Sequence, residues 1–278
     1  MIILTKDMNK PDIQNAKHIE FVGLPGSGKT HLLKRLSRKN KKTKLTPSKI
    51  KCGETKYLIK LKKRNIRWTY YFIPKILQRK LAKKYYNIRF NREETEALIQ
   101  FVEKYKPFLQ LISDILYKKD VRDVFLSIRK FETIIIDYIL SQSYMDDNEI
   151  ILFDEGFVQK IVGLHLTAGI TYCNLKEYIN KSPMPKLIIH VDAPVELAHQ
   201  RLNKRGWPAW LPTKNNLSKW QLLSQTKEKI DSICDLYSNN NVPIITIQNE
   251  HISKEYISKK FYEIEHLTFD STRKHTRQ

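Results

Sequence analysis

The segment from Gly23 to Thr30, with the sequence GLPGSGKT, restricts the fold of this chain more than any other part of it. It satisfies the pattern GxxxxGK followed by Ser or Thr, which is typical of loops that hold phosphate groups. An apolar run from Ile19 to Val22 precedes it and predicts a buried strand, and leucines at helical spacing follow it. Glycines let such a loop turn tightly, so that backbone N–H groups and a helix N-terminus point at one phosphate. The segment therefore predicts a strand, a phosphate-binding loop and a helix.

The chemistry of this loop predicts the cofactors. The Lys29 ammonium can reach the β- and γ-phosphates of a nucleotide, and the Thr30 hydroxyl can ligate a magnesium ion. We therefore expect ATP and Mg²⁺ as cofactors, with Thr30 as one metal ligand. The candidate nucleotide-binding residues are Gly23, Pro25, Gly26, Ser27, Gly28, Lys29 and Thr30.

A pair of acids follows a second apolar run. Ile150 to Phe153 predicts a buried strand, and Asp154 and Glu155 come directly after it. A carboxylate at that position lies at the edge of the sheet where open α/β folds bind their ligands. We predict that Asp154 helps to hold the metal ion, and that Glu155 orients or deprotonates a hydroxyl of a second substrate. The alternative is a solvated pair of acids at a strand end.

Two arginines follow a third strand, which is expected near 187–191. Arg201 and Arg205 are four residues apart on the helix after Pro194, so they share one helix face. Such a helix can bring an arginine over a transferring phosphoryl group, where negative charge spreads in the transition state. Both are therefore candidate catalytic residues, against the alternative of an ordinary basic helix face.

Strands alternate with helices along most of the chain, which is typical of a parallel sheet with helices on its faces. One long segment breaks the alternation: it lacks glycine, its apolar residues recur every three or four positions, and we interpret it as a helical insertion. Four or so helices are expected near 56–64, 74–87, 92–105 and 107–145, the last with a break around Lys119. The predicted organisation is a flexible arm at 1–17, a core at 18–55 and 148–268, a basic helical insertion at 56–147 and a flexible tail at 269–278.

The order of these motifs resembles that of the P-loop kinases, with thymidylate and deoxynucleoside kinases nearest in pattern. The resemblance rests on GLPGSGKT, on the strand that ends in the acid pair, on HVDAPVELAHQRLNKRG and on VPIITIQ before the last helix. The same motifs are similar to those of uncharacterised ATP-binding proteins encoded with bacterial surface-polysaccharide genes. The resemblance covers 17–46 and 150–266 but not the insertion.

The resemblance implies an α/β fold, a P-loop NTPase core with a five-stranded parallel sheet flanked by helices, and ATP-dependent phosphoryl transfer. It also implies a mobile lid that carries Arg201 and Arg205 and includes 206–216, and a loop near Gln248 and Asn249 beside the adenine. Thymidylate and deoxynucleoside kinases usually have an arginine after the strand acid, where this chain has Glu155. Their substrate motifs are not recognisable here, so the acceptor stays open among a nucleoside, a nucleotide and a carbohydrate or envelope precursor.

The chain has 50 Lys and Arg against 29 Asp and Glu, a formal charge of +21, and this charge is concentrated in one segment. From Lys34 to Arg89 there are 21 basic residues and one acid, Glu54, so the rest of the chain is close to neutral. Residues 65–86 mix this charge with aromatic residues. We weigh three interpretations of this segment. Residues 60–89 contact an anionic membrane surface, or the segment binds nucleic acid, which is less favoured. In the third interpretation it is an ordinary helix whose apolar face packs into the domain. That face comprises Ile73, Ile76, Leu77, Leu81 and Tyr85.

The sequence thus predicts a P-loop kinase with a small-molecule phosphate acceptor. Two alternatives stay open: a polynucleotide 5′-kinase, suggested by the basic segment, and a non-catalytic interaction module gated by ATP. Three widely spaced cysteines, Cys52, Cys173 and Cys234, indicate neither a disulfide set nor a zinc site and favour a reducing compartment. Since the chain shows no signal-peptide pattern and no long apolar run, we expect a cytoplasmic protein, with peripheral attachment to a membrane left open. The sequence does not indicate the oligomeric state.

Overall fold

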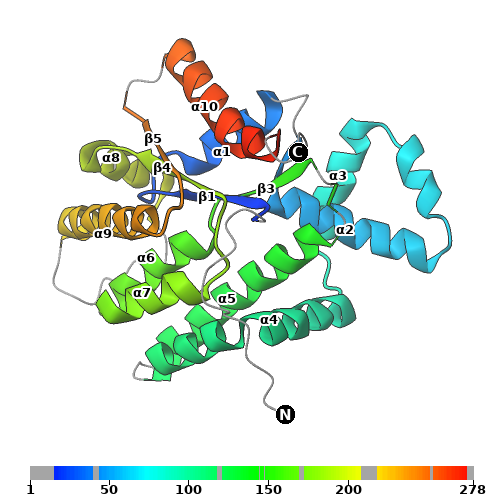
Figure 1. Cartoon of the computed structure of the whole chain (residues 1–278), viewed down its shortest axis with the longest axis horizontal. Coiled ribbons are helices and arrows are strands. Elements are labelled where there is room, and N and C mark those ends of the chain that lie inside the picture. The colour runs from blue at the N-terminus through cyan, green and yellow to red at the C-terminus, as the bar shows by residue number, and fades with distance from the viewer. Residues whose placement is uncertain are drawn as a thin grey trace.

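The computed structural model describes residues 16–39, 44–117, 121–143, 145–146, 148–168, 172–207, 218–250 and 253–273. Its centre is a five-stranded sheet in the order β2-β3-β1-β4-β5, and every neighbouring pair is parallel (Figure 1). The expected α/β architecture with five parallel strands is therefore confirmed. The strands are β1 (His18–Val22), β2 (Lys44–Pro47), β3 (Glu149–Phe153), β4 (Leu187–Asp192) and β5 (Ile244–Gln248).

Helices cover both faces of this sheet (Figure 1). One face packs on α1 (Lys29–Lys39) and α10 (Lys254–Arg273), whose apolar residues share a buried cluster with Ile19 and Phe21 of β1. The other face packs on a larger cluster. Because both faces are buried, the strands read as continuous apolar runs rather than as alternating ones. The helices that contribute to the larger cluster are α4 (Asn91–Tyr117), α5 (Val121–Gln142), α6 (Phe157–Ala168), α7 (Tyr172–Lys181), α8 (Val195–Arg205) and α9 (Lys219–Asn239).

The arrangement of strands β1 and β3 fixes the position of the ligand crevice. They are neighbours in the sheet, yet the helix after β1 lies on one face and the helix after β3 lies on the other. The chain segments that leave the carboxyl ends of β1 and β3 therefore run to opposite faces of the sheet. The crevice between these segments is the switch point at which open α/β folds bind ligands. The phosphate-binding loop comes directly after β1, and the acid pair comes directly after β3.

The first helix of the insertion starts earlier than predicted. Helix α2 (Ser48–Lys63) follows β2 directly, so the predicted start of this helix near residue 56 is wrong. Gly53 weakened the helical pattern at this point, yet it is a packing residue: a Cβ there would overlap the carbonyl oxygen of Ala82 in α3 (Lys75–Tyr86). The glycine therefore allows α2 and α3 to pack closely. The short 3-10 helix η1 (Arg67–Phe72) joins them.

Two further boundaries bear on the prediction. The break expected between 105 and 107 coincides with a kink in α4, where Tyr105 has non-helical angles of φ −122° and ψ 31° and Pro107 follows. The proline removes one backbone hydrogen bond, which is a common cause of such a kink. Helix α10 extends to Arg273, beyond the predicted start of the tail at 269. Residues 1–15 of the predicted arm, 274–278 of the tail and the break expected around Lys119 lie outside the described residues.

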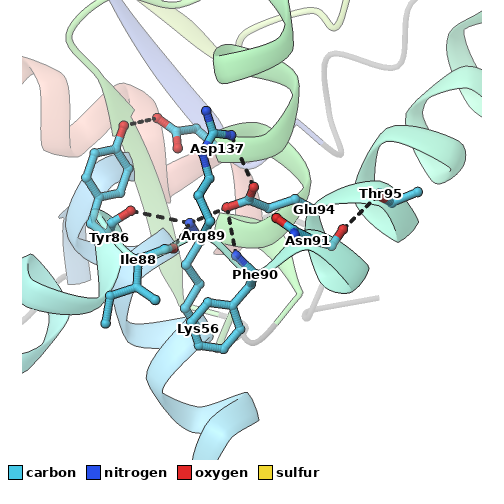
Figure 2. A network of polar contacts seen from close by, with 9 residues as sticks. All are labelled: Lys56, Tyr86, Ile88, Arg89, Phe90, Asn91, Glu94, Thr95 and Asp137. Atoms are coloured by element: carbon cyan, nitrogen blue, oxygen red, sulfur yellow. Dashed lines mark hydrogen bonds and ion pairs between the residues drawn. The ribbon is translucent and has the colours of Figure 1, made fainter.

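A buried lysine ties the insertion together (Figure 2). Lys56 of α2 donates to Glu94 Oε1 of α4 at 2.7 Å, and to the carbonyl oxygens of Tyr86 and Ile88 at 3.3 and 3.0 Å. Both side chains of the ion pair are less than a tenth exposed. This network holds the end of α3 and the start of α4 against α2.

No helix among the described residues is long and apolar enough to span a membrane.

Candidate active site

The loop from Gly23 to Thr30 joins β1 to α1 as predicted, and its conformation depends on its glycines. Gly26 and Gly28 have φ angles of 87° and 94°, in the left-handed region that side chains rarely adopt. A Cβ at Gly28 would also overlap the side-chain amide of Asn249. The first backbone N–H groups of a helix have no partner within the helix, so α1 offers its own to a ligand in this loop.

Side chains from three other elements hold this loop. Gln159 of α6 accepts from the Gly23 N–H at 3.2 Å, and the Asn249 amide donates to the Ser27 carbonyl. Arg201 Nη1 of α8 donates to the Gly26 carbonyl at 3.2 Å. These contacts join segments far apart in the chain, and they give the loop a fixed shape before any ligand enters.

Lys29 lies folded against the loop. Its ammonium donates to the carbonyl oxygens of Gly23 and Leu24 at 2.8 and 3.0 Å. Burial lowers the pKa of Lys29 to about 8, although the carboxylates of Asp154 and Glu155 act in the opposite direction. A phosphate group would replace the lost hydration and favour the charged form, so this lysine is suited to bind an anion.

Thr30 and Asp154 meet across the crevice. The Thr30 hydroxyl donates to Asp154 Oδ2 at 2.6 Å, and Asp154 Oδ1 is buried without a hydrogen-bond partner. Oxygen donors of this kind suit Mg²⁺, and a buried carboxylate oxygen with no partner is costly unless a cation binds there. The two predicted metal ligands are thus brought together, and their chemistry fits the ion. No cluster of three or more His, Cys, Asp or Glu side chains that could hold a metal occurs among the described residues.

Glu155 points into the same region and is paired with a residue that the sequence analysis did not single out. Lys160 Nζ of α6 lies 3.0 Å from Glu155 Oε2. Burial acts to raise the pKa of Glu155, but the ammonium groups of Lys160, Lys29 and Lys49 outweigh it and lower the pKa. Glu155 is therefore ionised at neutral pH and able to accept a hydrogen bond from a hydroxyl group.

A buried glutamate on the central strand positions this acid pair. Glu20 is fully buried, and its Oε2 accepts from the Val158 N–H at the start of α6, at 2.7 Å. A Cβ at Gly156 would overlap the Glu20 carboxylate, so this carboxylate packs directly against the loop that follows Glu155. The acidic residue within the apolar run HIEFV was the available signal for this role.

The two arginines of α8 lie in different surroundings. Arg201 contacts the phosphate-binding loop, as described above, whereas Arg205 is exposed one turn further along. Arg205 is near enough to act on Lys29, where it favours a lower pKa. Of the predicted lid, Gly206 and Trp207 are described, with the Trp207 indole N–H donating to Asn203 Oδ1 at 2.8 Å. Residues 208–216 lie outside the described residues.

A cavity of about 1140 Å³ opens beside Thr30, Asp154 and Glu155. Its far wall consists of the helical insertion, because residues of α2, α3 and α5 line it together with α1. The cavity thus extends from the acid pair to the helices that replace a recognisable substrate motif. Its volume is ample for a small-molecule ligand.

Positive charge dominates the lining of this cavity. Nine of its side chains are basic and four are acidic. The basic residues are arranged in rows: two on α1 and three on α3 are spaced four residues apart, so each row follows one helix face. The rows are Lys34 and Arg38 of α1 and Lys75, Arg79 and Lys83 of α3, and Arg129 and Lys130 of α5 also line the cavity.

Comparisons with known proteins give few matches for this chain. No protein-family model matches it, and no curated protein matches it. Among solved structures, deoxyadenosine kinase from M. mycoides with bound dCTP is similar, with 11% sequence identity, a TM-score of 0.43, and coverage of 89% of this chain and 98% of that one. The decisive observation is the chain's own topology: a phosphate-binding loop after the central strand of five parallel strands, beside a strand that ends in Asp154. This is a P-loop kinase-like fold.

The P-loop core contains three site residues that the sequence analysis missed: Glu20, Gln159 and Lys160. Asn249, which the resemblance implies lies beside the adenine, also contacts the P-loop through Ser27. These residues form no motif along the chain, because the sheet brings them together only after folding.

In the helical insertion, Asp137 of α5 lines the cavity, and we expect it to make stability depend on pH. It accepts from the Tyr86 hydroxyl at 3.1 Å, and burial raises its pKa to about 6 (Figure 2). A carboxyl whose pKa is higher in the folded state binds more protons folded than unfolded, so its contribution to stability falls as the pH rises from about 4 to about 6.

We expect this contribution to change by about 2 kcal/mol across that window and to be absent in Asp137→Asn. Urea unfolding of both proteins at a series of pH values measures it. A difference between the two proteins that stays constant from pH 4 to pH 7 would show that Asp137 titrates normally.

Proposed function

We propose that this protein transfers the γ-phosphoryl group of ATP to a small anionic acceptor bound in the basic cavity. The observation that carries the proposal is the position of the cavity. It begins at Thr30, Asp154 and Glu155, which adjoin the P-loop, and it ends at the helical insertion. An acceptor there has its reactive oxygen next to the site where the terminal phosphate would lie.

The residues of the site divide the chemistry among them. The P-loop N–H groups and Lys29 hold the phosphates of the donor and offset their charge. Thr30 and Asp154 would hold Mg²⁺, which when bound offsets charge on the phosphate oxygens. Glu155 is ionised, and it accepts a hydrogen bond from the acceptor hydroxyl and directs that oxygen toward phosphorus. Arg201, and Arg205 one turn further, add positive charge from the side of α8.

The charge of the lining indicates the class of acceptor. A neutral nucleoside or sugar gains little from nine basic side chains, whereas a phosphate or carboxylate group is attracted and oriented by them. The rows lie on α1 of the core and on α3 of the insertion, so they suit an acidic group of the acceptor besides its reacting hydroxyl. We therefore favour an acceptor that already carries a phosphate or a similar anionic group.

A panel of matched acceptors tests this choice. Each nucleoside or sugar is paired with its monophosphate and incubated with ATP labelled in the γ-phosphate, and a 5′-hydroxyl oligonucleotide is included. We expect transfer to the phosphorylated member of a pair and little transfer to its neutral partner. Transfer to the oligonucleotide alone would identify a polynucleotide kinase instead, and ATP binding with no transfer to any acceptor would favour the interaction module.

Replacing the acid next to the metal site separates catalysis from binding. Glu155→Gln should lower turnover by about 10²-fold or more, because the amide does not accept the acceptor's proton, while ATP affinity changes little. Steady-state kinetics and equilibrium titration with ATP measure the two effects. Glu177→Gln is a matched control, since Glu177 lies on α7 and pairs with Lys181 at the surface. Unchanged turnover in Glu155→Gln would exclude this role.

A further inference from the structure

An exposed apolar surface lies at the tip of the α2–η1–α3 hairpin. Large apolar side chains of η1 and of the first turn of α3 point outward there, with Phe72 79% and Ile76 72% exposed. In Figure 1 the hairpin extends to the right, away from the sheet and from α10. We call these residues the tip patch: Ile66, Trp68, Tyr71, Phe72, Ile76 and Leu77.

The tip patch bears on the three interpretations weighed for this segment. In the interpretation as an ordinary helix, Ile76 and Leu77 would pack into the domain on one helix face with Tyr85, yet both are exposed. Helix α3 packs on α2 through Ala82 and Tyr85, next to Gly53, while its first turn has no such cover. An ordinary surface helix buries its apolar side, so the outward position of these residues requires another explanation.

Basic residues surround the tip patch. From Lys60 to Lys84 the chain has ten Lys or Arg residues and no acid. Lys63 pairs with Glu93, and Lys60 donates to the Tyr85 hydroxyl, so these two point toward the body of the protein. The other eight are exposed, and five of them do not line the cavity: Lys62, Arg64, Arg67, Lys80 and Lys84, whereas Lys75, Arg79 and Lys83 line it.

We propose that the tip patch docks on an anionic membrane surface. Aromatic and aliphatic side chains enter the boundary between headgroups and acyl chains, while lysine and arginine side chains reach anionic headgroups from the rim. A second copy of this chain would set the same positive charge against itself. Nucleic acid would use the aromatic rings for stacking but leaves Ile76 and Leu77 without a role.

The docking surface is distinct from the acceptor cavity, although both use α3. Lys75, Arg79 and Lys83 line the cavity, whereas Ile76 follows the next row around the helix, about 100° away. Docking therefore requires neither ATP nor an acceptor. The proposal stands or fails independently of the phosphotransferase activity.

Flotation of the full chain with lipid vesicles tests the proposal. One set contains only phosphatidylcholine, and the other contains phosphatidylcholine with about a third phosphatidylglycerol. We expect binding to the anionic vesicles, weakening as salt screens the charges, and little binding to the neutral ones. Phe72→Ser with Ile76→Ser should weaken binding to the anionic vesicles by about tenfold or more.

The matched control removes exposed apolar side chains elsewhere. Ile99→Ser with Tyr262→Ser alters α4 and α10, where both side chains are more than half exposed. This variant should bind vesicles like the wild type. Equal binding by both double variants, or no binding of the wild type to anionic vesicles, overturns the proposal. Tight salt-dependent binding to an oligonucleotide with no vesicle binding, or a dimer that Phe72→Ser with Ile76→Ser dissociates, assigns the patch to another partner and also overturns it.

Discussion

Lys29→Ala is expected to lower phosphoryl transfer by at least about 10³-fold while the protein stays folded. The ammonium lies 2.8 Å from the Gly23 carbonyl, within the loop that the proposed donor phosphates occupy. In the proposed mechanism, alanine removes the positive charge that stabilises the transferring phosphoryl group. It also removes a buried amine whose pKa burial has already lowered to about 8, so we expect little change in the free energy of unfolding. Transfer of label from ATP and thermal unfolding measure the two quantities.

The control for this prediction is a lysine outside the site. Lys259→Ala changes an exposed position on α10 and should leave both transfer and unfolding unchanged. Normal turnover of Lys29→Ala with an acceptor that the wild type uses would contradict the proposed mechanism. A loss of transfer with an equal loss of folded protein would show a structural effect instead.

Lys56→Met is expected to cost about 3–5 kcal/mol of the free energy of unfolding. Lys56 and Glu94 form a buried ion pair at 2.7 Å, and the lysine also donates to two carbonyl groups where α3 passes into α4. Without Lys56 the Glu94 carboxylate keeps its hydrogen bond from the Phe90 N–H and its ion pair with the exposed Arg89, but it loses its buried counter-ion. Urea unfolding at neutral pH measures the change.

Two variants make this prediction specific. Lys56→Met with Glu94→Leu should recover a large part of the loss, because no charge is then buried without its partner. Lys63→Ala breaks a neighbouring ion pair with Glu93 whose lysine is 59% exposed, and it should cost less than about 1 kcal/mol. A cost below about 1 kcal/mol for Lys56→Met as well would mean that the network in Figure 2 does not hold the insertion together.

The sheet was predictable because its strands are local signals. Each of the three central strands is mostly apolar and five or six residues long, and the P-loop marks the first of them. The start of the insertion was not predictable in the same way. Gly53 lowers the helical pattern of α2, and only the approach of α3 shows that the glycine belongs inside a helix.

The site was predictable where one motif supplies several residues. Thr30 and Asp154 each follow a strand, and parallel neighbouring strands bring them within 2.6 Å. Glu20, Gln159 and Lys160 serve the same loops from positions without a motif. The outward position of Ile76 could not be predicted either, since the helical periodicity is the same whether a face meets protein or lipid.

Transfer of label from γ-labelled ATP into a small-molecule extract tests the central claim most directly. The wild-type protein and Lys29→Ala are incubated side by side with ATP, Mg²⁺ and the extract, and the labelled products are separated and identified by mass. The wild type should label a compound that bears an anionic group in addition to the new phosphate, and Lys29→Ala should not. ATP binding by the wild type with no labelled product other than inorganic phosphate would contradict the claim.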